Sequence, residues 1–306
     1  MWADLGEILA SALDRLETLD FRLVAVAVAL QFANVALRST AWWGVLRAAY
    51  PETRIPLVRV GCAYAAGMAA NALLPARGGD GVKAVLARTS IAGSTLPTIG
   101  ATMAVTALFD AVLGVVAIAV AWTTGSAAWP ARLSHVPSPW LAVPVAVVIV
   151  AVAVVLWRRV PGRVRRLLAE LRQGGAILRT PQRYLTEVAL PQAGAWACRL
   201  GVIFALLHAF HIAASPGVAL AVLVLGGVSS AVPVLPGGAG AQQVMVVYAL
   251  RASATAGAAL SFSLGMQVGI TACNAILGIA ALTLLFRTLR PFAALRASRA
   301  LALGDG

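Results

Sequence analysis

The chain has 306 residues, of which 60% are hydrophobic and 11% charged. Soluble globular proteins carry roughly 25% charged residues, so we interpret the chain as an integral membrane protein. Its formal net charge of +13 suggests a nucleic-acid partner, but the basic residues lie in loops between apolar segments, which argues against nucleic acid. The three cysteines lie in apolar segments without paired spacing and are interpreted as small packing residues: Cys62, Cys198 and Cys273.

Residues 1–22 carry five acidic residues and two arginines, with leucine and isoleucine at helical spacing. This pattern predicts an amphipathic helix lying on a membrane face. The segment lacks the basic start and small-residue cleavage pattern of a signal peptide.

Five apolar stretches are long enough to cross a hydrocarbon core, which takes about 20 helical residues. They are residues 23–47, 97–122, 140–157, 188–208 and 257–286.

Two further apolar segments, 58–90 and 217–250, are interrupted by proline and glycine. The first contains "NALLPARGGDG" at 71–81 and the second "AVPVLPGGAGAQQ" at 231–243. Each segment is either a span with a tail or a helical hairpin that enters and leaves the membrane by one side.

The charged loops predict the orientation of the spans. Arg158 to Arg183 contains eight arginines and one glutamate, and residues 287–306 contain four arginines and one aspartate. Cytoplasmic loops are enriched in such residues, so we expect the loop 158–187 and the tail 287–306 in the cytoplasm. The basic loop is also suited to contact anionic headgroups. The loop 123–139, whose only ion is Arg132, is expected outside.

With these loops assigned, both interrupted segments must return to the side they entered. Each half then reads as span, re-entrant hairpin, span: a first repeat at 23–122 and a second, inverted repeat at 188–286, joined by the outer loop and connector span at 123–157. The sequence therefore predicts one all-α polytopic membrane domain, 1–306, with its N-terminus outside and its C-terminus in the cytoplasm. Transporters with inverted repeats bind substrate near the midplane at their broken helices. The alternative is that both interruptions are ordinary loops.

Four features together resemble the flippase-like membrane domain of the lysylphosphatidylglycerol synthase family. They are "ALRSTAWWGVLRA" at the end of the first span, "NALLPARGGDGVKAVL", Asp110 in the next span, and "LPGGAG" in the second break. The chain departs from the family pattern at Gln242 and Gln243, where the family usually has an acid. An additional first span and an aminoacyl-transferase domain, both found in the family, are not expected here.

The resemblance implies a multi-pass plasma-membrane protein that translocates or handles an anionic phospholipid or a lipid-linked sugar. The alternatives are a scaffold or accessory protein for an envelope-lipid pathway and, with less support, a membrane-embedded lipid-modifying enzyme. No nucleophile, phosphate-loop or dinucleotide pattern occurs, so we expect neither enzymatic activity nor a cofactor. The sequence does not indicate the oligomeric state.

Charged residues inside spans are the first candidates for a ligand site. Asp110 lies mid-span, where a carboxylate costs on the order of 3 kcal/mol and should face protein or a cavity. Arg38 and Arg199 occupy comparable places in the two halves, and either is suited to neutralise Asp110 or to hold a lipid phosphate. Arg38 is also placed to extend toward the headgroups.

The breaks supply the remaining candidates. Bare N–H groups after proline and glycine are suited to bind an anion, and glycines let backbone approach it. Asp80 and Lys83 share a helix face, as a local ion pair or as ligand contacts. The candidate ligand-binding residues at the breaks are Arg77, Gly78, Gly79, Asp80, Lys83, Pro236, Gly237, Gly238 and Gly240.

Other polar residues inside apolar segments are suited to line a pathway or to join helices by hydrogen bonds. They are Asn71, Gln242, Gln243, Gln267 and Asn274. His208 and His211 have no cysteine or carboxylate nearby in the sequence, so we predict no metal site.

Overall fold

A computed structural model of the chain describes residues 19–73, 78–124, 169–229 and 240–286. Every regular element in these ranges is a helix, which confirms the all-helical class. Within the described ranges, four helices are long and apolar enough to cross a membrane. They are α2 (Phe21–Ala49), α5 (Leu96–Thr123), α9 (Leu190–Ala209) and α12 (Ala256–Phe286). They agree with four of the five predicted spans; the fifth, 140–157, and the loop 123–139 lie outside the described residues, apart from the end of α5.

Two helix starts differ from the sequence prediction. The backbone N–H of Arg22 donates to the Asp20 carboxylate at 2.9 Å, and this N-cap begins α2 at Phe21. The last residues of the predicted interfacial helix therefore belong to the first span, and residues 1–18 are not described. The span predicted from 188 begins at Pro181, because α8 (Pro181–Tyr184) and the π-helical turn η4 (Leu185–Ala189) run directly into α9.

The two interrupted segments form two pairs of short helices. The first pair is α3 (Leu57–Leu73) and α4 (Gly78–Ser90), and the second is α10 (Pro216–Ser229) and α11 (Ala241–Leu250). The two helices of each pair pack against one another. Each interrupted segment therefore contains two short helices packed together, and most of the residues between them lie outside the described ranges.

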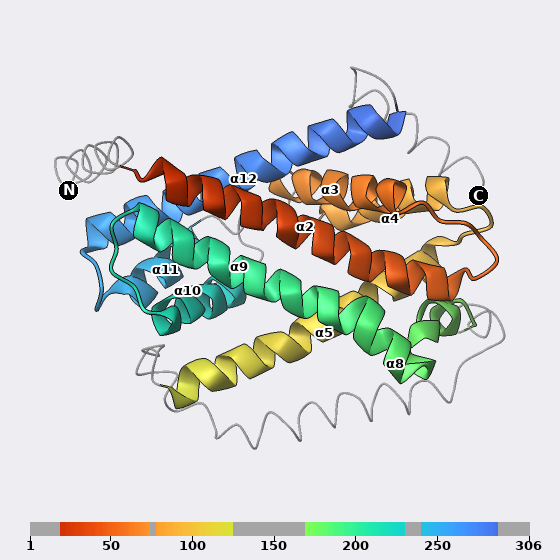
Figure 1. Cartoon of the computed structure of the whole chain (residues 1–306), viewed down its shortest axis with the longest axis horizontal. Coiled ribbons are helices and arrows are strands. Elements are labelled where there is room, and N and C mark those ends of the chain that lie inside the picture. The colour runs from red at the N-terminus through yellow and green to blue at the C-terminus, as the bar shows by residue number, and fades with distance from the viewer. Residues whose placement is uncertain (1–18, 74–77, 125–168, 230–239, 287–306) are drawn as a thin grey trace.

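The helices α2 and α9 cross the middle of the molecule side by side (Figure 1). The two helices run antiparallel, because the residue numbers of their contacts decrease along α2 as they increase toward and along α9. The contacts, seven residues apart, are Gly44 with Glu187, Leu37 with Gly194 and Leu30 with Gly201. A glycine stands at each of these contacts and lets the partner's side chain approach the helix closely.

The other helices lie on the two sides of this central pair. On one side α12 packs along α3, where Gly278 contacts Ala65 and Ala69. On the other side α5 packs along α10, where Ala121 clusters with Ala221 and Val224. The last span of each half therefore contacts the first short helix of the opposite half.

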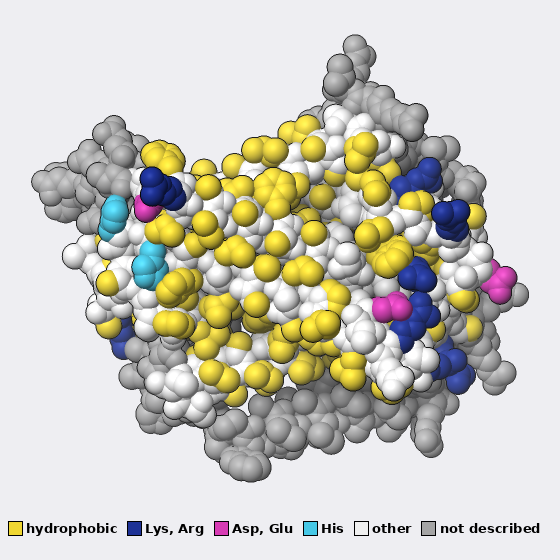
Figure 2. Space-filling view, viewed as in Figure 1, with side chains coloured by type: hydrophobic (Ala, Val, Ile, Leu, Met, Phe, Trp, Pro, Cys, Tyr) yellow, Lys and Arg dark blue, Asp and Glu magenta, His cyan; other side chains and the backbone are white. Residues whose placement is uncertain are grey.

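The described surface of the long helices is largely apolar. Figure 2 shows hydrophobic side chains over the centre of one face, while most of its Lys and Arg side chains gather where α2 ends and α8 begins. Many large apolar side chains of the long helices are exposed, among them Val115 at 65%, Val268 at 67% and Ile276 at 65%. An apolar surface of this extent fits a membrane-embedded belt.

The described part of the basic loop is folded onto the helix ends. Ile177, in the turn η3 (Ala176–Arg179), is fully buried, and the side-chain amide of Gln173 donates to the Ala49 carbonyl at 2.9 Å. Gly174 lies so close to Thr98 and Ala101 of α5 that a side chain there would collide. This segment therefore packs against the C-terminal end of α2 and the N-terminal end of α5.

Candidate functional site

An ion pair between two spans forms the centre of the site. The Arg38 guanidinium of α2 donates to the Asp110 carboxylate of α5, with 2.7 Å between Nη1 and Oδ2. The side chains of Arg38 and Asp110 are 13% and 32% exposed. Of the two arginines that the sequence offered as partners for Asp110, Arg38 makes this ion pair.

The second oxygen of Asp110 is held by α9. The Trp196 indole N–H donates to Oδ1 at 2.8 Å, and the Gln192 amide lies 3.4 Å from the same oxygen. Gln192 also donates to the Thr106 carbonyl at 3.1 Å, and its own Oε1 is a buried acceptor with no partner among the described residues. The carboxylate thus connects three helices and keeps two donors that are independent of Arg38.

The arginine is oriented by a polar stripe along α2. The Nε atom of Arg38 donates to Asn34 Oδ1 at 3.1 Å, Asn34 donates to Gln31 at 3.3 Å, and Gln31 donates to Asn274 of α12 at 2.9 Å. Spacings of three and four residues place these side chains on one helix face. The chain of bonds fixes the guanidinium against Asp110 and links it to the last span.

A second cation, Lys83 of α4, lies in an aromatic cage. Its ammonium is 5.2 Å from the centre of the Trp42 ring and 4.7 Å from the centre of the Tyr64 ring. Asp80 Oδ1 lies 3.6 Å from the same nitrogen, so these two residues form the local ion pair that the sequence left as one of two readings. The Tyr64 phenol also interacts with Arg38, which joins the cage to the ion pair on α2.

The first break is closed by Asn71. Its side-chain oxygen accepts the N–H of Gly79 at 2.8 Å and so caps the start of α4. A Cβ at Gly79 would collide with the Gly67 carbonyl and with Asn71. Gly79 is buried against α3, whereas Gly78 is exposed. The close backbone approach at Gly79 is therefore to α3; Arg77 lies outside the described residues.

The second break is described only from Gly240 onward, so Pro236, Gly237 and Gly238 lie outside the described residues. Gly240 has φ 86°, a left-handed conformation that favours glycine. Its N–H donates to Gln243 Oε1 at 2.6 Å, and the Gln243 amide bonds to Gln267 of α12. Gln243 thus ties the start of α11 to the last span.

The remaining candidates lie on α9 and just beyond its end. Arg199 is exposed on α9, three residues beyond Trp196. The His208 ring bonds to the Phe204 carbonyl at 2.9 Å, and His211 has φ 56° where α9 has ended. Within the described part of the chain, no three His, Cys, Asp or Glu side chains are grouped to hold a metal ion.

Sequence reasoning missed most of the residues that surround Asp110 and Lys83. The missed residues are Gln31, Asn34, Trp42, Tyr64, Gln192 and Trp196. A signal existed for Gln31 and Asn34, because their spacing to Arg38 puts three polar groups on one face of an apolar helix. Trp42 falls within the motif "ALRSTAWWGVLRA" but was given no role, and Tyr64 and Trp196 gave no signal, since tryptophan and tyrosine are also common at membrane interfaces.

Comparison with known proteins places this chain in a family. The model of the family described as the lysylphosphatidylglycerol synthase TM region matches residues 2–278. The match takes in every described helix except the end of α12. No curated protein matches the chain.

Proposed function

The chain belongs to the family of the lysylphosphatidylglycerol synthase TM region, and from this premise we propose a flippase-like protein that translocates or handles an anionic lipid or a lipid-linked sugar. Membership in this family of membrane domains supports a lipid-related role. The proposal assigns the chain no enzymatic reaction.

The Arg38–Asp110 ion pair, held mid-span between apolar helices, is the observation that carries the proposal. Ionisable groups inside spans are costly and usually mark a substrate or ion pathway. A second ion pair, Lys83 with Asp80, lies next to the first. The two pairs are linked by Tyr64, whose ring contacts Lys83 and whose hydroxyl group interacts with Arg38. A purely structural bundle would gain as much from apolar packing.

The geometry supports an exchange of partners at Arg38. Asp110 keeps its bonds to Trp196 and Gln192 when Arg38 leaves, and Arg38 keeps its bond to Asn34. A lipid phosphate is thus able to replace the Asp110 oxygen on the guanidinium, which binds phosphate well through its planar fork.

The proposed architecture is two inverted repeats, each a span, a re-entrant hairpin and a span. Its support is that the contacts recur in both halves: α2 with α3 and α9 with α10, α3 with α12 and α10 with α5, and α2 with α9 as the central antiparallel pair. The lengths of the short helices also support re-entrant hairpins. The longest of them as described, α3, has 17 residues and measures about 25 Å at 1.5 Å per residue, which is less than the about 30 Å thickness of a hydrocarbon core.

The proposed orientation, with the N-terminus outside and the C-terminus cytoplasmic in the plasma membrane, follows the positive-inside tendency. Its support is the gathering of basic side chains at one end of the described surface (Figure 2). Cysteine-accessibility labelling in intact cells tests it, because residues 123–139 must then react with an impermeant reagent from outside.

The function is tested by lipid exchange in vesicles containing the full chain. Phosphatidylglycerol with a fluorescent acyl chain is bleached from outside by dithionite, with and without a proton gradient, and a polyprenyl-phosphate-linked sugar forms a second arm. We expect the native protein to speed exchange of one of these lipids and Arg38→Gln to lose about tenfold or more of that rate. Arg22→Gln, an exposed change on the same helix, is the charge-matched control. A native protein that moves neither lipid contradicts the proposal and favours a scaffold.

A further inference from the structure

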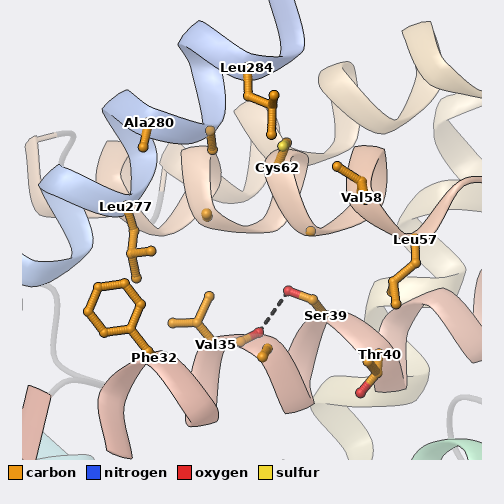
Figure 3. A pocket seen from close by; sticks show the side chains of 14 residues that line it. Phe32, Val35, Ser39, Thr40, Leu57, Val58, Cys62, Leu277, Ala280 and Leu284 are labelled. Carbon is orange, nitrogen blue, oxygen red and sulfur yellow. Dashed lines mark hydrogen bonds between the residues drawn. The ribbon is translucent and has the colours of Figure 1, made fainter. Parts of the chain in front are cut away.

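A groove of about 410 Å³ lies between α2, α3 and α12. Figure 3 shows Phe32 and Val35 of α2 and Leu277 and Leu284 of α12 directed toward it, and α3 contributes Val58 and Cys62. Its size lies within the about 300–1,000 Å³ of ligand pockets. Three helices therefore form a concave apolar site within the proposed membrane belt.

The groove offers nothing to a polar ligand. Its hydroxyl groups are bonded within their own helix: Ser39 Oγ donates to the Val35 carbonyl at 2.7 Å and Thr40 Oγ1 to the Leu37 carbonyl at 2.8 Å. The other lining side chains are hydrocarbon, apart from the Cys62 thiol. A hydrocarbon chain suits such a surface, and water does not.

The groove is separate from the Arg38 site. At 100° per residue, the α2 residues that line it point to a different face of the helix from the polar stripe of Gln31, Asn34 and Arg38. Occupancy of the groove therefore does not require the ion pair to open.

Positive charge lies at the end of the groove where α3 begins. Leu57 and Val58 line this end, with the exposed residues Arg54 three positions before Leu57 and Arg59 directly after Val58. Glu52 is the acid of the same turn, and Arg47 stacks on Trp43 nearby. The end is thus net positive, and this is the arrangement expected beside a lipid phosphate.

We propose that this groove binds one anionic glycerophospholipid, with an acyl chain between α2, α3 and α12 and the phosphate at Arg54 and Arg59. The bound lipid is distinct from the one handled at Arg38. The proposal concerns binding and does not depend on transport.

Photolabelling tests the acyl-chain half. The full chain is placed in nanodiscs containing phosphatidylglycerol with a diazirine in its acyl chain, and labelled residues are mapped by mass spectrometry. We expect labels on α2, α3 and α12 at the groove, and a severalfold loss in Gly61→Leu and in Ala36→Phe, which fill it. The matched control is Gly100→Leu: like Gly61 it is the fifth residue of its helix, and an added Cβ there meets nothing. Equal groove labelling in the control and both filling variants overturns the proposal.

A choline-headgroup probe with the same acyl chain tests the charge half. We expect weaker groove labelling by phosphatidylcholine, and about fivefold weaker labelling by phosphatidylglycerol for each arginine lost in Arg54→Gln and Arg59→Gln. Arg22→Gln, at the opposite end of α2, should leave labelling unchanged. If the two lipids label equally and the arginine variants change nothing, the anionic-lipid assignment is wrong.

The variant Arg38→Gln separates this site from the proposed transport site. We expect it to retain groove labelling even where lipid exchange is lost. Loss of groove labelling in correctly folded Arg38→Gln would overturn the inference that the two sites are separate.

Discussion

Arg38 and Asp110 stand 72 residues apart in the sequence, yet their side chains form an ion pair of 2.7 Å between the first span and the last helix of the first half. Because Asp110 is also bonded to Trp196, this one carboxylate joins both halves of the protein. Removing either charge must therefore affect both stability and the proposed lipid site.

The first prediction is a double-mutant cycle on this pair. Breaking a fully buried pair costs about 3–5 kcal/mol, and the partial exposure of Asp110 lowers the expected cost of Arg38→Gln or Asp110→Asn to about 2 kcal/mol each. The double variant should lose less than the sum, since no unpaired charge remains. Unfolding in mixed detergent measures these values, with Arg22→Gln as the control. Strict additivity would contradict the observed pairing.

The second prediction concerns the first break. Gly79→Ala should destabilise the protein by about 1–3 kcal/mol, because the added methyl group collides with the Gly67 carbonyl and Asn71. Gly81→Ala, two residues further along the same helix, meets nothing within 4 Å and should stabilise it by about 0.5–1 kcal/mol. Thermal unfolding of the purified variants compares them. Equal behaviour would show that α4 does not pack this closely on α3.

The aromatic cage around Lys83 provides the third prediction. Tyr64→Leu and Lys83→Met should show a coupling of about 0.5–2 kcal/mol, since each removes one partner of a cation–π contact. Tyr64→Phe retains the ring and should retain most of that coupling, although it removes the hydroxyl group near Arg38. A coupling near zero for Tyr64→Leu would place the ammonium outside the cage.

A fourth prediction tests the start of α11. Gly240→Ala should cost about 1–2 kcal/mol because its φ of 86° is unfavourable for a residue with a Cβ. Gly269→Ala in the interior of α12, where an added Cβ meets nothing, is the control and should stabilise the protein by about 0.5–1 kcal/mol, as Gly81→Ala should. Thermal unfolding is the measurement here too, and an equal shift in both variants would argue against the left-handed turn.

Much of the described architecture was predictable because membrane-spanning helices depend on local composition. About 20 apolar residues suffice to define a span, and four described spans lie where the sequence put them. Both breaks were also predictable, because proline and glycine interrupt a helix through their own backbone properties. The helix start at Pro181 was missed because its first turns precede the apolar stretch. They contain charged residues such as Arg183 and Glu187, which hydrophobicity does not mark as part of a span.

The composition of the site was decided by tertiary packing. The sequence singled out Asp110 as a costly mid-span charge but offered both Arg38 and Arg199 as partners, and the crossing of α2 and α5 brings Arg38 to it. Trp196 and Gln192 join because α9 lies antiparallel to α2, with glycine at their contacts. The groove arises in the same way, since α2, α3 and α12 come from opposite ends of the chain. Hydrophobicity along a sequence determines which segments enter a membrane, whereas the contacts between their faces depend on how the helices pack.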